Sequence, residues 1–114
     1  MTLDFVAVCA SRPDVAVVLD ALLAAGPQLG LQPVPRSGEV QLLDEAGRVL
    51  VSIDGPILVQ VAGEAQRLLG VPSAPDPSWW VTCRADGTVL GATGAADRLC
   101  AELVRAAGGL TWPR

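Results

Sequence analysis

Few side chains in this sequence can carry out acid–base or nucleophilic chemistry. The chain has no His, Lys or Tyr, so the residue most often used as a general base or zinc ligand is missing, together with its usual replacements. The carboxylates fall mostly at expected helix caps, turns and solvent faces. Asp54 precedes Gly55-Pro56, where a functional carboxylate at a strand end is an alternative to the favoured turn-forming role. This shortage of catalytic side-chain types predicts that the protein is not an enzyme.

The three cysteines, Cys9, Cys83 and Cys100, are the candidate thiol nucleophiles. Their odd number and wide spacing match neither a disulfide framework nor a zinc site. All three fall at apolar positions, where free cysteine behaves as a small buried hydrophobe. Arg84 beside Cys83 would favour a thiolate, but the sequence offers no base. We therefore expect structural thiols.

Two further segments have the composition of ligand sites without the pattern. The glycine-rich stretch Gly87–Gly94 precedes an expected helix, but it lacks both the Gly-Lys-Ser/Thr ending and the GxGxxG spacing of phosphate-binding loops. Asp44-Glu45 lies in an expected hairpin turn and is typical of a solvated turn rather than a metal site. The sequence therefore predicts no cofactor and no metal.

A tandem pair, Trp79 and Trp80, is the strongest indication of a binding surface, because the chain has only four aromatic residues. In a strand, adjacent side chains point to opposite faces, so one indole should enter the core and the other should point out. Tryptophan is enriched at contact surfaces. The proline-rich stretch before the pair either adds to a partner-binding surface or folds over the second ring. The predicted partner-binding residues are Trp79, Trp80, Val71, Pro72, Pro75 and Pro77.

Length and charge narrow the class of protein further. With 114 residues the chain is expected to form one domain, residues 1–114. A net charge of −4 without lysine argues against nucleic-acid and lipid surfaces and is compatible with a basic protein partner. The run Val15–Gly26 is shorter than the ~20 residues that span a bilayer. Because Met1–Ala10 also lacks a signal peptide's basic start, we expect a cytoplasmic protein without membrane insertion.

The first half of the chain alternates strand and helix patterns. An apolar run predicts a buried strand over Leu3–Ala10, and Ser11 is expected to cap the helix that follows. The expected apolar face of that helix consists of Val15, Val18, Leu19, Leu22 and Leu23. Gln28–Gly38 has loop composition. Two strands, Val40–Leu43 and Val49–Ile53, are predicted to form an antiparallel hairpin.

The second half predicts one more strand and two helices. Ile57–Val61 is either a short strand or the approach to a short helix over Gly63–Leu69. Trp79–Arg84 is the last predicted strand. Thr93 is expected to cap a helix over Ala95–Ala107, and Gly108-Gly109 to end it. Trp112 in the tail is expected to dock on the core.

Together these elements predict an α+β, two-layer fold. We expect a small mixed or antiparallel sheet of four or five strands with two long helices on one face, in the order β-α-β-β-(β)-α-β-α. A βαββαβ core with an added C-terminal helix would be a ferredoxin-like split βαβ arrangement.

Several segments resemble an actinobacterial family of unassigned function that is encoded near type VII secretion genes. The resemblance rests on Met1–Asp14, Ala25-Gly26-Pro27, Gly47–Ser52, Leu58–Glu64, Trp79-Trp80-Val81 and Gly108–Pro113. It implies a cytoplasmic accessory, adaptor or chaperone-like protein of a secretion system.

The leading hypothesis from the sequence is a non-enzymatic protein–protein interaction module, for which a homodimer is one form of contact. The alternative is an immunity protein that neutralises a secreted toxin, a role suited to an acidic single domain. An enzyme would need a carboxylate or Cys83 in a deep pocket.

Overall fold

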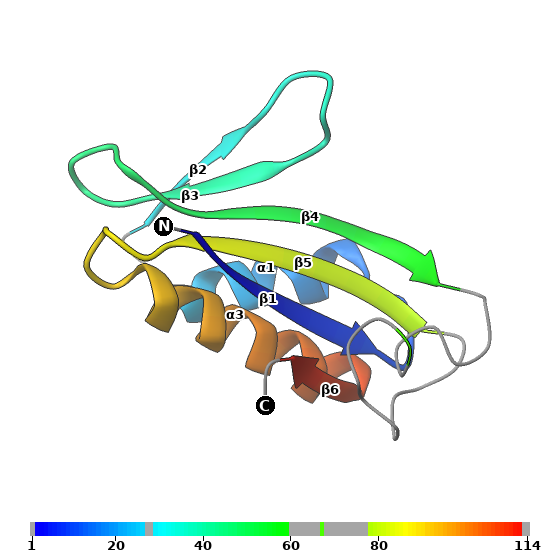
Figure 1. Ribbon diagram of the computed structural model, residues 1–114. Coiled ribbons are helices and arrows are strands. Elements are labelled where there is room, and N and C mark those ends of the chain that lie inside the picture. Colours follow the sequence, from blue (N-terminus) through cyan, green and yellow to red (C-terminus); the bar gives the residue numbers. More distant parts are fainter. Residues whose placement is uncertain (1, 27–28, 60–66, 68–77, 113–114) are drawn as a thin grey trace.

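The computed structural model describes residues 2–26, 29–59, 67 and 78–112. These residues form a compact α+β fold of one sheet and two helices (Figure 1). The elements in chain order are β1 (Thr2–Cys9), α1 (Val15–Ala25), β2 (Gly30–Pro33), β3 (Val40–Leu43), β4 (Val49–Val59), β5 (Ser78–Asp86), α3 (Ala92–Ala107) and β6 (Gly109–Trp112).

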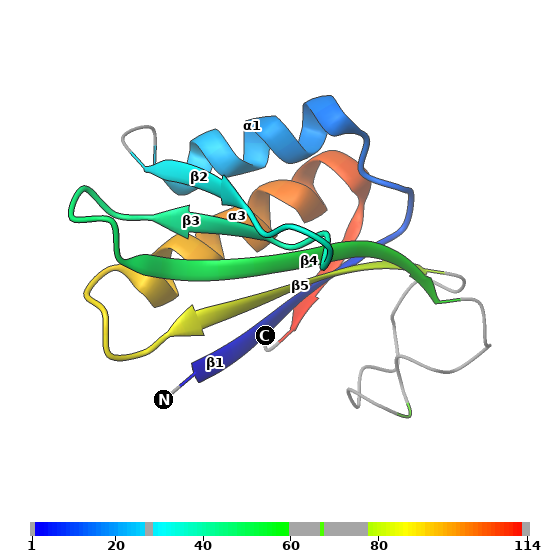
Figure 2. The same cartoon turned by 90° about the horizontal axis from the view of Figure 1, so that it is seen from above.

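The sheet has six strands in the order β2-β3-β4-β5-β1-β6, and every neighbouring pair is antiparallel. The whole of β1 pairs with β5, whereas β6 pairs only with Val6–Cys9 of β1. Both helices lie on one face of the sheet (Figures 1 and 2). The helix α3 packs on four strands and on α1, while α1 packs mainly on α3.

The core lies between α3 and the central strands. Val81, Cys83 and Ala85 alternate along β5 and are buried on the helix side. They share one core cluster with Leu99 and Leu103 of α3, each 1% exposed. Each such leucine contributes about 1.5–3 kcal/mol through removal of its apolar surface from water. These residues hold α3 against the sheet.

The helix starts differ from the sequence predictions. Asp14, not Ser11, is the N-cap of α1, because its carboxylate accepts a hydrogen bond of 2.9 Å from the Val17 N–H. The Ser11 hydroxyl instead donates to the Ala107 carbonyl at 3.0 Å and ties the end of β1 to the end of α3. The predicted cap at Thr93 is also wrong, since α3 begins after Gly91, which has a positive φ and no side chain to cap the helix. Gly108 ends α3 as predicted.

The antiparallel sheet and the two helices are confirmed, but the predicted strand count is wrong. Residues 30–33, expected in a loop, form β2, and residues 109–112, expected in a tail, form β6. The strand predicted over 49–53 continues to Val59 through an irregularity between Asp54 and Ile57. Gly55 permits this irregularity, because a Cβ there would lie 2.5 Å from the Trp80 carbonyl oxygen and its φ is +114°. The helix predicted over 63–69 falls outside the described residues apart from residue 67.

The predicted element order changes with these corrections. The segments β1-α1-β4-β5-α3-β6 follow the order βαββαβ, and their strands lie in the sheet as β4-β5-β1-β6. This is the connectivity of a split βαβ arrangement, but it is built from different elements than the sequence predicted. The hairpin β2–β3 widens the sheet beside β4. In the part of the chain that the structure describes, neither helix is long and apolar enough to cross a membrane.

Candidate functional site

The two tryptophans at the start of β5 are both half-buried and lie on opposite faces of the sheet. Trp79 shares its face with the alternate core residues of β5 and packs against the core under the helices. Trp80 lies opposite Val8 of β1 and Ile57 of β4 on the other face. The predicted partner residues Val71, Pro72, Pro75 and Pro77 lie outside the described residues.

A cation covers the ring of Trp79. The guanidinium carbon of Arg12, in the loop before α1, lies 5.3 Å from the centroid of that ring. This distance is within the range of a cation–π contact, worth about 0.5–1 kcal/mol at an exposed site. The guanidinium of Arg12 is therefore held over Trp79 at the start of α1.

Trp80 anchors an apolar cluster on the face of the sheet opposite α1 and α3. Its indole N–H donates a 2.8 Å hydrogen bond to the hydroxyl of Ser78, which is 2% exposed. Val6 and Val8 are buried on this face of β1, opposite Trp112 and Leu110 of β6. Trp112 thus lies against the sheet on the side away from the helices.

An apolar groove separates α1 from the β2–β3 hairpin. The two helices do not cover the sheet up to the β2–β3 hairpin, because α1 packs mainly on α3. The hairpin tip stands away from the helices (Figure 1). The space left, which we call the α1 groove, has a volume of about 660 Å³ and is lined by Arg12, Pro13, Asp14, Val18, Leu19, Leu22, Leu31, Pro33, Val40, Gly55 and Pro56.

The apolar side of α1 is rotated from its predicted position. Ala21, Leu22 and Ala25 are the residues of α1 buried in the core. Leu19 and Leu23, predicted to face the core, are 48% and 61% exposed. The sequence could not identify the core side, because ten of the eleven residues of α1 are apolar. Sequence reasoning also missed Leu31, which is 49% exposed across the groove.

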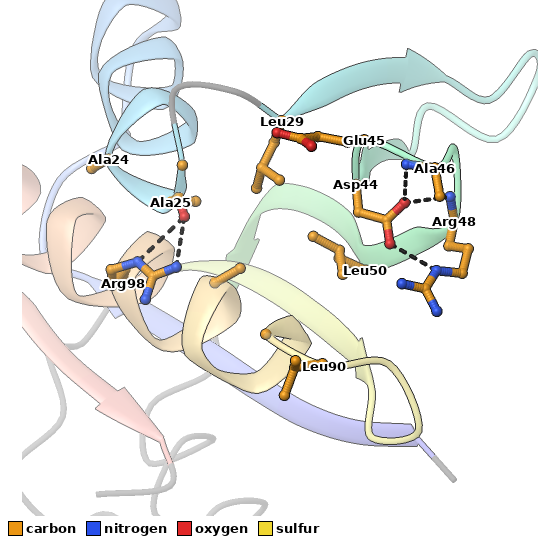
Figure 3. A pocket seen from close by; sticks show the side chains of 13 residues that line it. Ala24, Ala25, Leu29, Asp44, Glu45, Ala46, Arg48, Leu50, Leu90 and Arg98 are labelled. Atoms are coloured by element: carbon orange, nitrogen blue, oxygen red, sulfur yellow. Dashed lines mark hydrogen bonds and ion pairs between the residues drawn. The ribbon is translucent and has the colours of Figure 1, made fainter.

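A second cleft, of about 700 Å³, lies at the other end of α1 (Figure 3). Its two arginines already have partners. Arg48 Nε lies 2.8 Å from the Asp44 carboxylate, and Arg98 donates two hydrogen bonds to the Ala25 carbonyl. The Arg48 backbone N–H lowers the pKa of Asp44 most, followed by the Arg48 side chain and the Ala46 N–H. The charges in this cleft stabilise the β3–β4 turn and the end of α1.

The thiols lack the properties of nucleophiles. All three are buried and free. Burial raises the pKa of Cys9 to about 11, and the contact with Cys100 together with burial raises the pKa of Cys83. The Sγ atoms of Cys100 and Cys83 lie 3.7 Å apart. A raised pKa disfavours the reactive thiolate. Asp54, the other catalytic candidate, is exposed on β4, and the described residues contain no group of three metal-ligating side chains.

Neither a family model, nor a curated protein, nor a solved structure matches this chain. The function must therefore be inferred from the geometry of the molecule itself.

Proposed function

We propose that the chain is a non-enzymatic protein-interaction module that binds a partner helix along α1. The observation that carries this proposal is the exposure of Leu19 and Leu23, at 48% and 61%, on a helix with one charged residue. A helix that is apolar all round is normally buried on all sides. The outer side of α1 is therefore suited to cover by another protein.

The exposed residues of α1 have the spacing of a helix–helix contact. Ala16, Leu19 and Leu23 are all exposed and follow the pattern i, i+3, i+7. This is the stripe that one amphipathic helix presents to another. We call Ala16, Leu19 and Leu23 the α1 stripe.

The charge of the chain favours a basic partner over a second copy. Asp20 is the only charged residue of α1, and the whole chain carries a net charge of −4. Acidic surfaces attract basic partners and repel their own copies. We therefore infer a partner helix with an apolar stripe flanked by Lys or Arg.

The tryptophan surface predicted from the sequence extends this proposal. Trp79 with its Arg12 lies at the start of α1, and both residue types are frequent among energetically dominant interface residues. The resemblance to the secretion-linked family supports a cytoplasmic accessory, adaptor or chaperone-like role as the biological setting. The immunity-protein alternative uses the same acidic surface against a basic toxin.

The test compares two single substitutions of exposed leucines. Leu23→Glu changes the α1 stripe, and Leu90→Glu changes a 96% exposed leucine in the loop between β5 and α3. Proteins retained from the source cell by immobilised wild-type chain are identified, and each is purified and titrated. We expect one partner with a basic amphipathic helix that binds wild type and Leu90→Glu alike and Leu23→Glu at least tenfold more weakly.

Two results would reject the proposal. One is a partner that binds Leu23→Glu as tightly as wild type, and the other is a chain that stays monomeric and retains no protein. Co-expression with toxins encoded beside the chain separates the two biological settings, because only an immunity protein restores growth.

A further inference from the structure

We propose that the α1 groove binds a single-chain carboxylate amphiphile, such as a long-chain fatty acid. Its alkyl chain would lie against Leu22, Leu31 and Val40, and its carboxylate would meet Arg12. This ligand site is separate from the partner contact on the α1 stripe, although Leu19 borders both and Arg12 also contacts the Trp79 ring.

The size and lining of the groove suit a small apolar ligand. Its volume of about 660 Å³ falls within the range of about 300–1,000 Å³ that is typical of small-molecule sites. The side chains from α1, β2 and β3 that line it are all apolar. Leu31 and Pro33 alternate with Gln32 on β2, so their side chains share the groove side of the hairpin. An alkyl chain would be in contact with carbon on both walls.

Among the described residues that line the groove, the charged side chains are Arg12 and Asp14, which both come from the loop before α1. Asp14 is engaged by the Val17 N–H as the cap of α1. In the described part of the chain, Arg12 is in no ion pair and contacts the face of Trp79. A guanidinium stacked on a ring keeps its N–H edge available for a carboxylate. Arg12 thus offers a guanidinium edge to a carboxylate at this end of the groove, and hydrocarbon lines most of the rest.

A peptide fits the groove less well than an alkyl chain does. The Val34 N–H bonds to the Glu39 carbonyl, so in the alternation of an antiparallel ladder Gln32 and Gly30 also bond to β3. Of the four residues of β2, Leu31 alone then directs an N–H outward, because Pro33 has none. An added strand would find only the Leu31 N–H and the carbonyls of Leu31 and Pro33 to pair with, so its ladder would be short and incomplete.

A helix is too large to enter the same space. Two turns of helix, about 11 Å long and 10 Å wide, occupy roughly 850 Å³, more than the 660 Å³ of the groove. A partner helix therefore remains on the outer α1 stripe. A second copy is disfavoured by the net charge of −4.

Calorimetric titration with dodecanoate below its micelle concentration tests the proposal. We expect one saturable site per chain, with decanoate, two methylenes shorter, binding roughly fifteenfold more weakly because each buried methylene contributes about fourfold. Leu31→Glu should weaken dodecanoate at least tenfold. Arg12→Gln should weaken dodecanoate but not dodecyltrimethylammonium, which has the same chain and a cationic head, whereas Arg12→Lys should retain dodecanoate binding.

Matched controls keep the two proposals apart. Leu90→Glu and Leu23→Glu lie outside the groove lining and should bind dodecanoate like wild type, and circular dichroism verifies that every variant is folded. The proposal is overturned if dodecanoate does not saturate one site, if Leu31→Glu binds it unchanged, or if the cationic amphiphile binds as tightly. A dimer that Leu31→Glu dissociates would instead show that a second copy fills the groove. Loss of partner binding in Leu23→Glu leaves this test unaffected.

Discussion

Replacing Leu99 by alanine should destabilise the fold by about 3 kcal/mol, whereas the same substitution at Leu23 should cost at most about 1 kcal/mol. Leu99 is 1% exposed in the core beneath α3, and Leu23 is 61% exposed on α1. Both lie within helices, so the change in helix propensity is the same for each and cancels in the comparison.

The magnitudes follow from burial. Leu→Ala removes three carbon atoms, worth about 0.8 kcal/mol each when fully buried, or roughly 2.4 kcal/mol. At Leu99 the cavity left in the packed core raises the loss to about 3 kcal/mol, within the usual range of about 2–5 kcal/mol. At Leu23 only about two fifths of that transfer energy applies, and solvent fills the space.

Urea denaturation followed by circular dichroism at 222 nm measures both values. With a slope of about 2 kcal/mol per molar urea, the midpoint of Leu99→Ala should fall by roughly 1.5 M and that of Leu23→Ala by at most 0.5 M. Equal shifts for the two variants would refute the assignment of the outer side of α1 to solvent. An unchanged slope confirms that both variants unfold between the same two states.

Two further predictions concern the helix cap and the thiols. Asp14→Ala should cost about 1 kcal/mol of unfolding free energy because the Val17 N–H loses its acceptor, while Asp14→Asn should retain most of the stability; equal losses in the two variants would contradict the capping role. The raised pKa values of Cys9 and Cys83 keep these thiols protonated in the folded state, whereas in the unfolded chain they ionise near pH 9. The unfolded state then binds fewer protons, so stability should fall as the pH rises above about 9 toward 11, and Cys9→Ser with Cys83→Ser should flatten that decline.

The sequence was sufficient to predict those elements whose structure is decided by a local pattern of residues. The period-2 and continuous apolar runs identified β1, β3, β5 and the start of β4, because each strand buries one face wherever it pairs. The helix α3 has apolar residues on one side only, and these are the residues that it buries in the core. Gly108 ended it for the local reason that glycine adopts a positive φ.

The orientation of α1 and the shape of its surroundings depended on distant residues. With only Asp20 to mark a polar side, periodicity could not show which leucines face water, and packing on α3 decided it. Ser11 and Asp14 are both good helix caps by type, and the bond from Ser11 to Ala107, far along the chain, left the cap to Asp14. β2 forms only because β3 is there to pair with it.

Some features of the candidate sites also follow from the sequence, whereas others depend on the tertiary structure. The absence of His, Lys and Tyr and the apolar character of α1 follow from the sequence alone, since they concern which side chains exist. The α1 groove required the tertiary structure, because Arg12, Leu22, Leu31 and Pro56 come from four separate segments. No local rule links them. Because α1 packs mainly on α3, the two helices leave the space beside the β2–β3 hairpin where these residues meet.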